Sequence, residues 1–416
     1  WQPPISTTSS KRGKAPAALP AVTVAAAAAI EVTTLTSSRR VSRATAGAAI
    51  ALLAQSVAHA AVLPDDRADV LYHRYDGGGV TIDGPSVLLR KKFAEKYSVS
   101  ANYYMDMVSS ASIDVMTTAS PYTEERTQGS LAFDLLQGKT QYSVSYTLSD
   151  ESDYTANTAS FDLTQDIFGD LATVSFGFSQ GWDEVRKNGD NAFEETVDRR
   201  NYRFGLQLIV TPRLMTGLNY EVITDEGFLN NPYRSVRYLD ETSARGFSFQ
   251  PELYPHTRTS NAVSINARYF LPHRAAVHGE YRYFTDTWGI DANTASIGYT
   301  HPWGKRWIFE VGYRWYDQSA ADFYSDLFPR ADAQNFLARD KELSTFTSHM
   351  FSLGATYELA SLGWDRLRRS TVNLFYDRIN YQYDDFRDIT AGGAPGTEEL
   401  YGFDADVFRL FVSGWF

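Results

Sequence analysis

Cysteine is absent from the 416-residue chain, which excludes disulfides, thiolate metal sites, thiol nucleophiles and covalently attached c-type haem. Long apolar runs are absent too. The mean hydropathy is −0.33, and no stretch approaches the roughly 20 apolar residues that a membrane helix needs. An excess of positive charge is also missing, because the net charge is −11, and this argues against nucleic acid as a partner. Helical membrane proteins, disulfide scaffolds and nucleic-acid-binding proteins are therefore set aside.

Aromatic side chains, in contrast, are abundant. They make up 14% of the chain, with 26 Tyr, 25 Phe and 8 Trp. Aromatic girdles at the two membrane–water interfaces of a barrel account for such an excess.

The last eleven residues alternate in polarity. Apolar residues or glycine occupy Phe408, Leu410, Val412, Gly414 and Phe416, while the intervening positions include Arg409 and Ser413. This ending resembles the closing strand of bacterial outer-membrane β-barrels, which the barrel-assembly machinery reads, although Gly414 stands where that signature often has Tyr. The resemblance implies an outer-membrane location, with lipid, lipopolysaccharide and that machinery as partners.

The N-terminal region has the features of an exported precursor. Three arginines precede the apolar run 46–54, and Ala58 and Ala60 then form a small-x-small cleavage site. We expect residues 1–60 to be a disordered leader plus signal peptide, cleaved near Ala60 and Ala61. A short periplasmic segment, 61–67, would follow, and 68–416 would form a single barrel. The first methionine is Met105, so we expect translation to start nearer residues 35–41 from a codon read as Val or Leu.

Segments of about ten residues with alternating polarity recur from residue 68 onward, as in transmembrane strands. They predict an all-β, antiparallel, up-and-down transmembrane barrel of about sixteen strands, with fourteen or eighteen left open. The predicted strands are 68–75, 80–92, 97–108, 127–136, 140–148, 158–165, 172–180, 199–211, 214–223, 258–271, 275–284, 293–301, 307–316, 347–359, 371–383 and 403–416.

The connections predict the orientation. Short turns at 93–96, 138–139, 168–170, 211–213, 272–274 and 302–305 alternate with long segments at 109–126, 181–198, 224–257, 317–346 and 384–402. Short periplasmic turns and long extracellular loops are typical of outer-membrane barrels. This order places the C-terminus and the start of the first strand on the periplasmic side.

Charged residues in the strands share one face, which we expect to line the lumen, because a Lys or Arg facing mid-membrane lipid costs roughly 2–4 kcal/mol. Two interpretations remain open: a solvated, self-neutralising wall, or a constriction that selects solutes by charge. Folding the hairpin at 272–274 would bring His278 near Arg268. The lumen-lining candidates are Arg203, Glu221, Arg268, His278, Glu280, Arg282, Glu310 and Arg314.

A Tyr-rich stretch, 103–112, runs from a strand into an external loop. It contains Asp106, Ser109, Ala111 and Ser112 in an Asp-x-x-Ser-x-Ala-Ser-like arrangement. This element resembles an uncharacterised family of proteobacterial outer-membrane barrels, a domain of unknown function, over about residues 66–416. The resemblance implies a fold and a compartment but no activity. Asp106 and Ser109 could instead cap a folded-in loop through local hydrogen bonds.

Three functions from different classes fit these patterns. The first is a porin-like passive channel for small hydrophilic solutes. The second is a scaffold or receptor barrel that holds a lipoprotein or redox partner. The third is an outer-membrane hydrolase that uses His278, although no nucleophile–base spacing supports it. We expect no catalytic set, no transition-metal site and no organic cofactor. Divalent cations on acidic loops such as 150–153 and a homo-oligomer, as in many porins, stay open.

Overall fold

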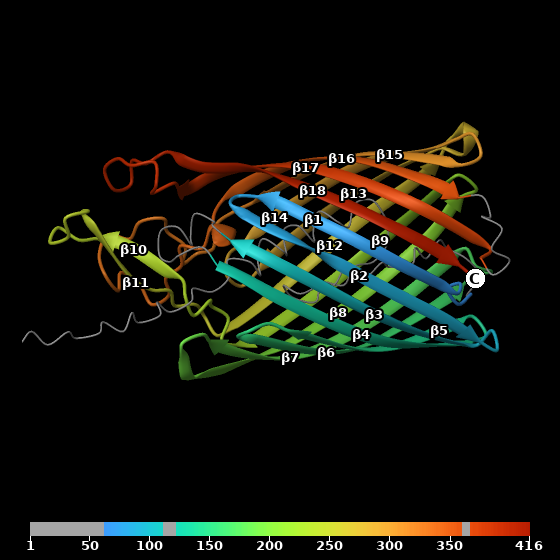
Figure 1. The fold of residues 1–416 in the computed structure, drawn as a ribbon, viewed down its shortest axis with the longest axis horizontal. Coiled ribbons are helices and arrows are strands. Elements are labelled where there is room, and N and C mark those ends of the chain that lie inside the picture. Colours follow the sequence, from blue (N-terminus) through green and yellow to red (C-terminus); the bar gives the residue numbers. More distant parts are fainter. Residues whose placement is uncertain (1–61, 111–121, 360–366) are drawn as a thin grey trace, which may run out of the picture.

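The computed structural model describes residues 62–110, 122–359 and 367–416, and sixteen of its strands close into one antiparallel barrel (Figure 1). The predicted all-β barrel is thereby confirmed. The barrel strands are β1 (Arg67–Gly77), β2 (Val80–Phe93), β3 (Tyr97–Ser110), β4 (Tyr122–Gln137), β5 (Thr140–Asp150), β6 (Tyr154–Ile167), β7 (Ala172–Lys187), β8 (Asp190–Thr211), β9 (Leu214–Gly227), β12 (Thr257–Phe270), β13 (Ala276–Asp286), β14 (Asp291–Trp303), β15 (Trp307–Gln318), β16 (Phe346–Leu359), β17 (Arg369–Arg387) and β18 (Leu400–Trp415).

Strands β1 and β18 close the barrel by pairing over eleven positions, from Arg67 opposite Trp415 to Gly77 opposite Ala405. The Trp415 ring lies between two guanidinium groups, 4.9 Å from Arg67 and 5.0 Å from Arg369. These cation–π contacts hold the periplasmic end of the seam. On the outer face of the seam, Phe408, Leu410 and Val412 are exposed.

The outer face of the barrel carries an apolar band bounded by tyrosines. Exposed side chains such as Val87, Val144, Ile265 and Val311 form the band. Toward the end with the long loops, tyrosine hydroxyls donate to polar groups on a neighbouring strand. These pairs are Tyr72–Asp83 (3.0 Å), Tyr146–Asn157 (2.6 Å), Tyr220–Asn261 (2.8 Å), Tyr281–Asn293 (2.7 Å) and Tyr376–Asp406 (2.6 Å). A ring of amphipathic tyrosines is typical of the membrane–water interface. No helix in the described parts of the chain is long and apolar enough to cross a bilayer.

The barrel has two unlike ends. The short turns gather at the end that holds the C-terminus, and the long connections lie at the opposite end (Figure 1). One predicted loop is wrong: 181–198 is not a loop, because β7 and β8 continue through it to a turn at Asn188-Gly189. Gly189 has φ +88°, a conformation that glycine adopts without strain. The backbone N–H and C=O groups of β7 and β8 thus hydrogen-bond to one another above the apolar band.

The predicted leader and the cleavage residues Ala58 and Ala60 lie outside the described residues, as do Ala111 and Ser112 of the loop element. Residues 62–66 precede β1 and include Asp65 and Asp66, which pair with Lys92 at 3.1 Å and Lys91 at 2.5 Å. The division of the chain into leader, periplasmic segment and barrel stays a prediction.

Three long connections form a cap outside the end opposite the C-terminus (Figure 1). We define the cap as residues 228–256, 319–345 and 388–399. It contains the two-stranded sheet β10 (Ser235–Leu239) and β11 (Phe247–Pro251) and the short 3-10 helix η2 (Lys341–Leu343). Tyr254, Phe323 and Leu343 pack with Trp288 of the β13–β14 turn in its core. The cap is therefore a folded unit with its own apolar interior.

Candidate functional site

The inner face of the barrel has two unlike walls. Most polar side chains that point inward from β5, β6, β8, β9 and β13 are partly or fully exposed, including Asp162 and Glu280. We call this the open wall. Most of those that point inward from β1, β3, β17 and β18, such as Asp106, Asp377 and Arg409, are buried. We call this the buried wall. Water therefore reaches the lumen surface mainly along the open wall.

Ion pairs line the open wall, and each of them spans an intervening strand, β7 or β12. Arg203 Nη2 donates to Asp162 Oδ1 at 2.8 Å, and Arg282 Nη2 donates to Glu221 Oε2 at 3.3 Å. Asn201 Nδ2 also donates to Glu221, at 2.9 Å. The Arg203 side chain lies across Gly177, where a Cβ would approach its Nε to 2.7 Å. Opposite charges thus neutralise one another in pairs, which favours the self-neutralising interpretation.

The structure places all eight lumen-lining candidates on strands whose neighbouring apolar residues face outward, such as Ile265 and Tyr281. Arg268 pairs directly with His278 across the β12–β13 hairpin. Arg314 is buried, with its guanidinium 5.3 Å from the Tyr316 ring. Their functional role stays a prediction.

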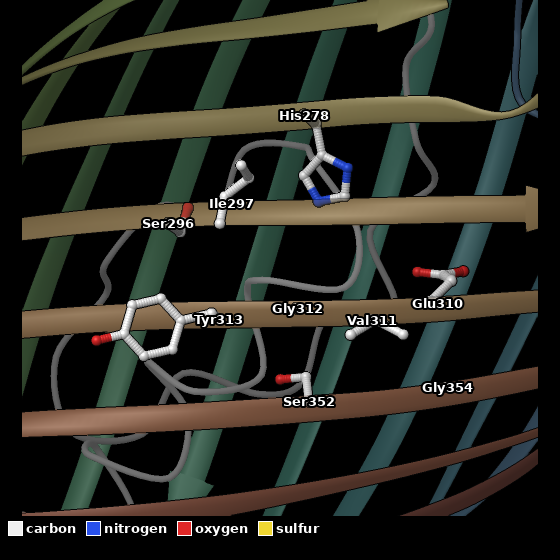
Figure 2. A pocket seen from close by; sticks show the side chains of 9 residues that line it. All are labelled: His278, Ser296, Ile297, Glu310, Val311, Gly312, Tyr313, Ser352 and Gly354. Carbon is white, nitrogen blue, oxygen red and sulfur yellow. The ribbon is translucent and has the colours of Figure 1, made fainter. Parts of the chain in front are cut away.

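His278 lies over strand β14, and Glu310 lies on β15 in the same pocket (Figure 2). Ser296 and Ser352 also line this pocket. A Cβ at Gly298 would come within 2.3 Å of His278 Nε2, so the glycine makes room for the imidazole. The hydrolase hypothesis named His278, and Glu310 is the carboxylate that lines the same pocket as this histidine.

A polar cluster that the sequence did not reveal lies on the buried wall. His73 Nε2 is 2.8 Å from Asp106 Oδ1, and the Tyr104 hydroxyl donates to the same oxygen at 2.7 Å. The Tyr104 hydroxyl is also 3.1 Å from His73 Nε2, and the two rings stack with centroids 4.9 Å apart. We call His73, Tyr104, Asp106 and Arg126 the inner-wall cluster.

Gly84 of β2 allows this cluster to form. His73 on β1 is paired with Gly84, and Asp106 lies on β3, so the imidazole reaches the carboxylate across a strand that offers no side chain there. Pro85 follows Gly84 and donates no ladder hydrogen bond, and the β2–β3 pairing is interrupted at both residues. The turn-forming tripeptide Asp83-Gly84-Pro85 thus interrupts the pairing of β2 with β3.

Replacing Gly84 by alanine should disrupt the contact that His73 makes with Asp106 across β2. Its Cβ would lie 1.9 Å from the Met105 carbonyl oxygen, a backbone atom that can move only by displacing β3. We expect lower stability of the folded barrel, measured as a decrease in the guanidinium midpoint. Gly129→Ala is the matched control, because nothing lies within 4 Å of its Cβ position. Equal midpoints for the two variants would contradict this account.

Arg126 extends the cluster toward the extracellular end. Its guanidinium lies 3.7 Å from Asp106 Oδ2 and 3.7 Å from Glu151, and it donates to Gln128 Oε1 at 3.1 Å. On the other side of His73, Arg409 donates to Asp377 at 2.6 Å. Charges of alternating sign therefore run across the inner face of the barrel from β17 to β4. Asp106 of the predicted loop element belongs to this band, whereas Ser109 near the end of β3 is exposed.

The cap is held together by a buried ionic network around Arg237, which is 0% exposed. Arg237 Nη1 and Nη2 donate to Glu398 at 2.5 and 3.1 Å, and Nε donates to the Asp326 carbonyl at 2.9 Å. Arg237 also pairs with the Asp326 carboxylate, which Arg339 contacts at 2.9 Å. One guanidinium thus joins all three segments of the cap.

Three carboxylates meet beside the β5–β6 turn. Glu124, Glu151 and Asp153 each offer one oxygen, and these oxygens lie within 4.8 Å of one another. Burial, together with the repulsion between these carboxylates, raises the pKa of Glu151 and of Asp153 to about 7. Oxygen ligands suit hard divalent cations, so the prediction of cation binding on acidic loops has its best geometry here. It stays a prediction.

The stability of this turn should fall as pH rises. Glu151 and Asp153 ionise near pH 4 to 4.5 when unfolded but near 7 in the folded chain, so the folded state binds protons more tightly. The stabilisation is complete below about pH 4 and is lost as pH rises through 7. Hydrogen exchange at 150–154, corrected for intrinsic rates, should show weaker protection at pH 8 than at pH 6. Glu151→Gln should reduce the difference in protection between the two pH values. A difference of the same size in the variant would contradict the role of Glu151.

No curated protein sequence matches the chain. Solved structures to which the chain is similar include the siderophore receptor PirA from Pseudomonas aeruginosa (11% identity, TM-score 0.41, 78% of this chain), of whose length the chain spans 60%. They also include a FadL homologue from Pseudomonas aeruginosa (10% identity, TM-score 0.41, 84% of this chain and 90% of that one). A third is the outer-membrane protein OmpT of Vibrio cholerae (9% identity, TM-score 0.41, 85% of this chain and 100% of that one).

The closed barrel and its apolar outer face make the protein an outer-membrane β-barrel. A family model matches residues 112–381, which is most of the barrel. The resemblance expected from the sequence is thereby confirmed, although Asp106 and Ser109 lie before the matched range. The chain belongs to the family described as protein of unknown function (DUF3570).

Proposed function

We propose that this barrel is a passive channel for small hydrophilic solutes. The observation that carries the proposal is the open wall, where charged and hydroxylated side chains remain accessible along five strands. A sixteen-stranded barrel is wide enough to enclose water, whereas a barrel of about eight strands is filled by its own side chains. Solutes would move along the open wall by diffusion.

The pairing of charges on that wall predicts weak selectivity. Arg203 with Asp162 and Arg282 with Glu221 each place one positive and one negative group at the same height. Such pairs give little net field for a passing ion. The proposed channel would therefore discriminate by size more than by charge, and neutral solutes would pass as readily as ions.

Liposome swelling with uncharged sugars of increasing size tests this proposal. Vesicles that contain the barrel should swell in small sugars and stop swelling above a size limit. Arg203→Gln should leave the size limit unchanged but favour cations in a salt-gradient potential, because Asp162 loses its partner. Asp162→Asn is the matched control and should favour anions. Vesicles that exclude even the smallest sugars would contradict the channel.

A receptor or scaffold barrel is the second candidate. The observation that favours it is the cap, whose three segments are fixed by the Arg237 network rather than left as loose loops. A preorganised extracellular surface is what a receptor needs. Cross-linking of intact cells followed by purification should then recover a partner in fixed ratio, such as a lipoprotein or a second copy of the chain. Recovery of the barrel without a partner would leave the channel as the better account.

A further inference from the structure

Basic side chains accumulate in the periplasmic turns of one half of the barrel. Arg213, Arg274, Lys305, Arg306 and Arg368 are all exposed there. In the described parts of these turns, 212–213, 271–275, 304–306 and 367–368, no aspartate or glutamate occurs. The whole chain has a net charge of −11, so this local excess of positive charge runs against its composition.

Basic residues in the other half of the rim are arranged differently. Lys91 is paired with Asp66 at 2.5 Å, Lys92 with Asp65 at 3.1 Å, and Lys139 with Asp170 at 2.6 Å. Their charge is therefore largely neutralised within the protein. In the other half Lys96 is exposed as well, so among the described residues the half-rim from β8 to β17 presents the larger number of cations to an outside partner.

An outward-facing aromatic cluster lies directly above the basic turn of β14 and β15. The Trp303 ring is 5.8 Å from Phe309, which stacks on Trp307 at 5.6 Å, and Trp307 lies 4.7 Å from Tyr357. Trp303 is 69% exposed, and the exposed lipid-facing residues Ile297 and Val311 lie farther along the same two strands. The cluster therefore marks the periplasmic edge of the apolar band.

The basic groups are attached to this cluster. Arg306 Nη1 donates to the Tyr357 hydroxyl at 3.2 Å, which holds a guanidinium on the lipid side of the wall. Arg274 Nη2 donates to the Gly304 carbonyl at 2.8 Å and so bridges two neighbouring turns. Lys305 directly precedes Arg306 in the β14–β15 turn and is exposed. Three cations thus lie in the two turns beside an exposed aromatic surface.

We propose that Arg274, Lys305 and Arg306, together with Trp303 and Trp307, bind the headgroup of an anionic phospholipid in the periplasmic leaflet. The three cations would hold the phosphate, and the rings would contact the glycerol and the upper acyl chains. A lipid fits better than an acidic protein, because the rings face the hydrocarbon and Arg306 is bonded to one of them. Basic residues at a membrane surface each favour anionic lipid severalfold, so three together should give at least about a tenfold preference.

Native mass spectrometry tests this proposal. The full-length barrel is released from nanodiscs that contain equal amounts of phosphatidylethanolamine and phosphatidylglycerol. The natural chain should retain phosphatidylglycerol about tenfold over phosphatidylethanolamine, and Arg274→Gln/Lys305→Gln/Arg306→Gln should retain both equally. Lys91→Gln/Lys92→Gln/Lys96→Gln removes the same charge from the other half-rim and should keep the preference. Heat-modifiable gel mobility confirms that each variant is folded.

Two results would overturn the proposal: equal retention of both lipids by the natural chain, or an unchanged preference in the first triple variant. If that variant fails to fold, Lys305→Gln alone should still lower the preference severalfold. Trp303→Ser should lower it as well, since the aromatic surface is part of the site. Binding of polyglutamate to the same half-rim in phosphatidylethanolamine nanodiscs, without any preference for phosphatidylglycerol, would identify an acidic polypeptide instead and contradict the lipid.

Discussion

Replacing Arg237 by methionine should release the cap from its fixed arrangement. The change leaves Glu398 and part of Asp326 buried without their main counter-charge. Breaking a buried ion pair by removing one partner costs about 3–5 kcal/mol. That is enough to separate the 388–399 segment from the other two segments of the cap, while the hydrogen-bonded barrel below should stay intact.

Limited proteolysis of the barrel in liposomes measures this release. Cleavage within 228–256 and 388–399 should become at least tenfold faster in Arg237→Met than in the natural chain, with unchanged heat-modifiable mobility. Arg245→Met is the matched control, because Arg245 is an exposed arginine of the same cap segment. Adding Glu398→Gln to Arg237→Met should restore part of the protection, because it removes the unpaired charge. Equal cleavage rates in Arg237→Met and Arg245→Met would show that the network does not hold the cap.

Replacing Asp106 by alanine should destabilise the barrel wall itself. The carboxylate accepts a hydrogen bond from Tyr104, contacts His73 and faces Arg126, and all four side chains are buried. Leaving buried polar groups without partners costs about 1–3 kcal/mol and more for charged ones. We expect a loss of about 2–4 kcal/mol in the free energy of unfolding.

Guanidinium unfolding of the reconstituted barrel measures this loss, and Asp162→Ala provides the comparison. Asp162 also accepts from an arginine, at 2.8 Å, but its side chain is 46% exposed on the open wall. A pair exposed to this extent contributes about 0–1 kcal/mol. The loss in the free energy of unfolding for Asp106→Asn should lie between those of the two alanine variants. Asparagine keeps an acceptor for Tyr104 but loses the charge. Equal losses for Asp106→Ala and Asp162→Ala would refute the distinction between the buried and the open wall.

Alternation of polarity was enough to predict the barrel, because a membrane strand must present every second residue to lipid. The pattern at Val263-Ser264-Ile265-Asn266 shows this, with Val263 and Ile265 exposed and Ser264 buried. The pairing of Arg268 with His278 followed from the short hairpin, since a tight turn fixes the register. Local sequence therefore determined most of the fold.

The prediction of a loop at 181–198 was wrong, because the charged residues of this segment belong to strands. Above the apolar band a barrel strand can be polar on both faces, since water replaces lipid outside. Glu184 and Asp198 are exposed on β7 and β8 for this reason. The apolar residues Val185 and Val197, which are buried, were the available sign of continued strands.

The inner-wall cluster and the Arg237 network could not be predicted, because both depend on contacts between distant segments. His73 and Asp106 are 33 residues apart, and Arg237 and Glu398 are 161 apart. A single sequence gives no sign of which charges will meet across a strand or between loops. The one local sign of the inner-wall cluster was Gly84-Pro85, which is unusual inside a strand. It marks the place where the His73 imidazole reaches across β2 to Asp106.

Planar-bilayer conductance of the purified full-length barrel tests the central proposal most directly. We expect stable, ohmic steps for the natural chain, with a larger conductance for Arg237→Met once the cap is released and no change for Arg245→Met. Persistent silence of all three proteins in bilayers where their folded state is verified would contradict the channel.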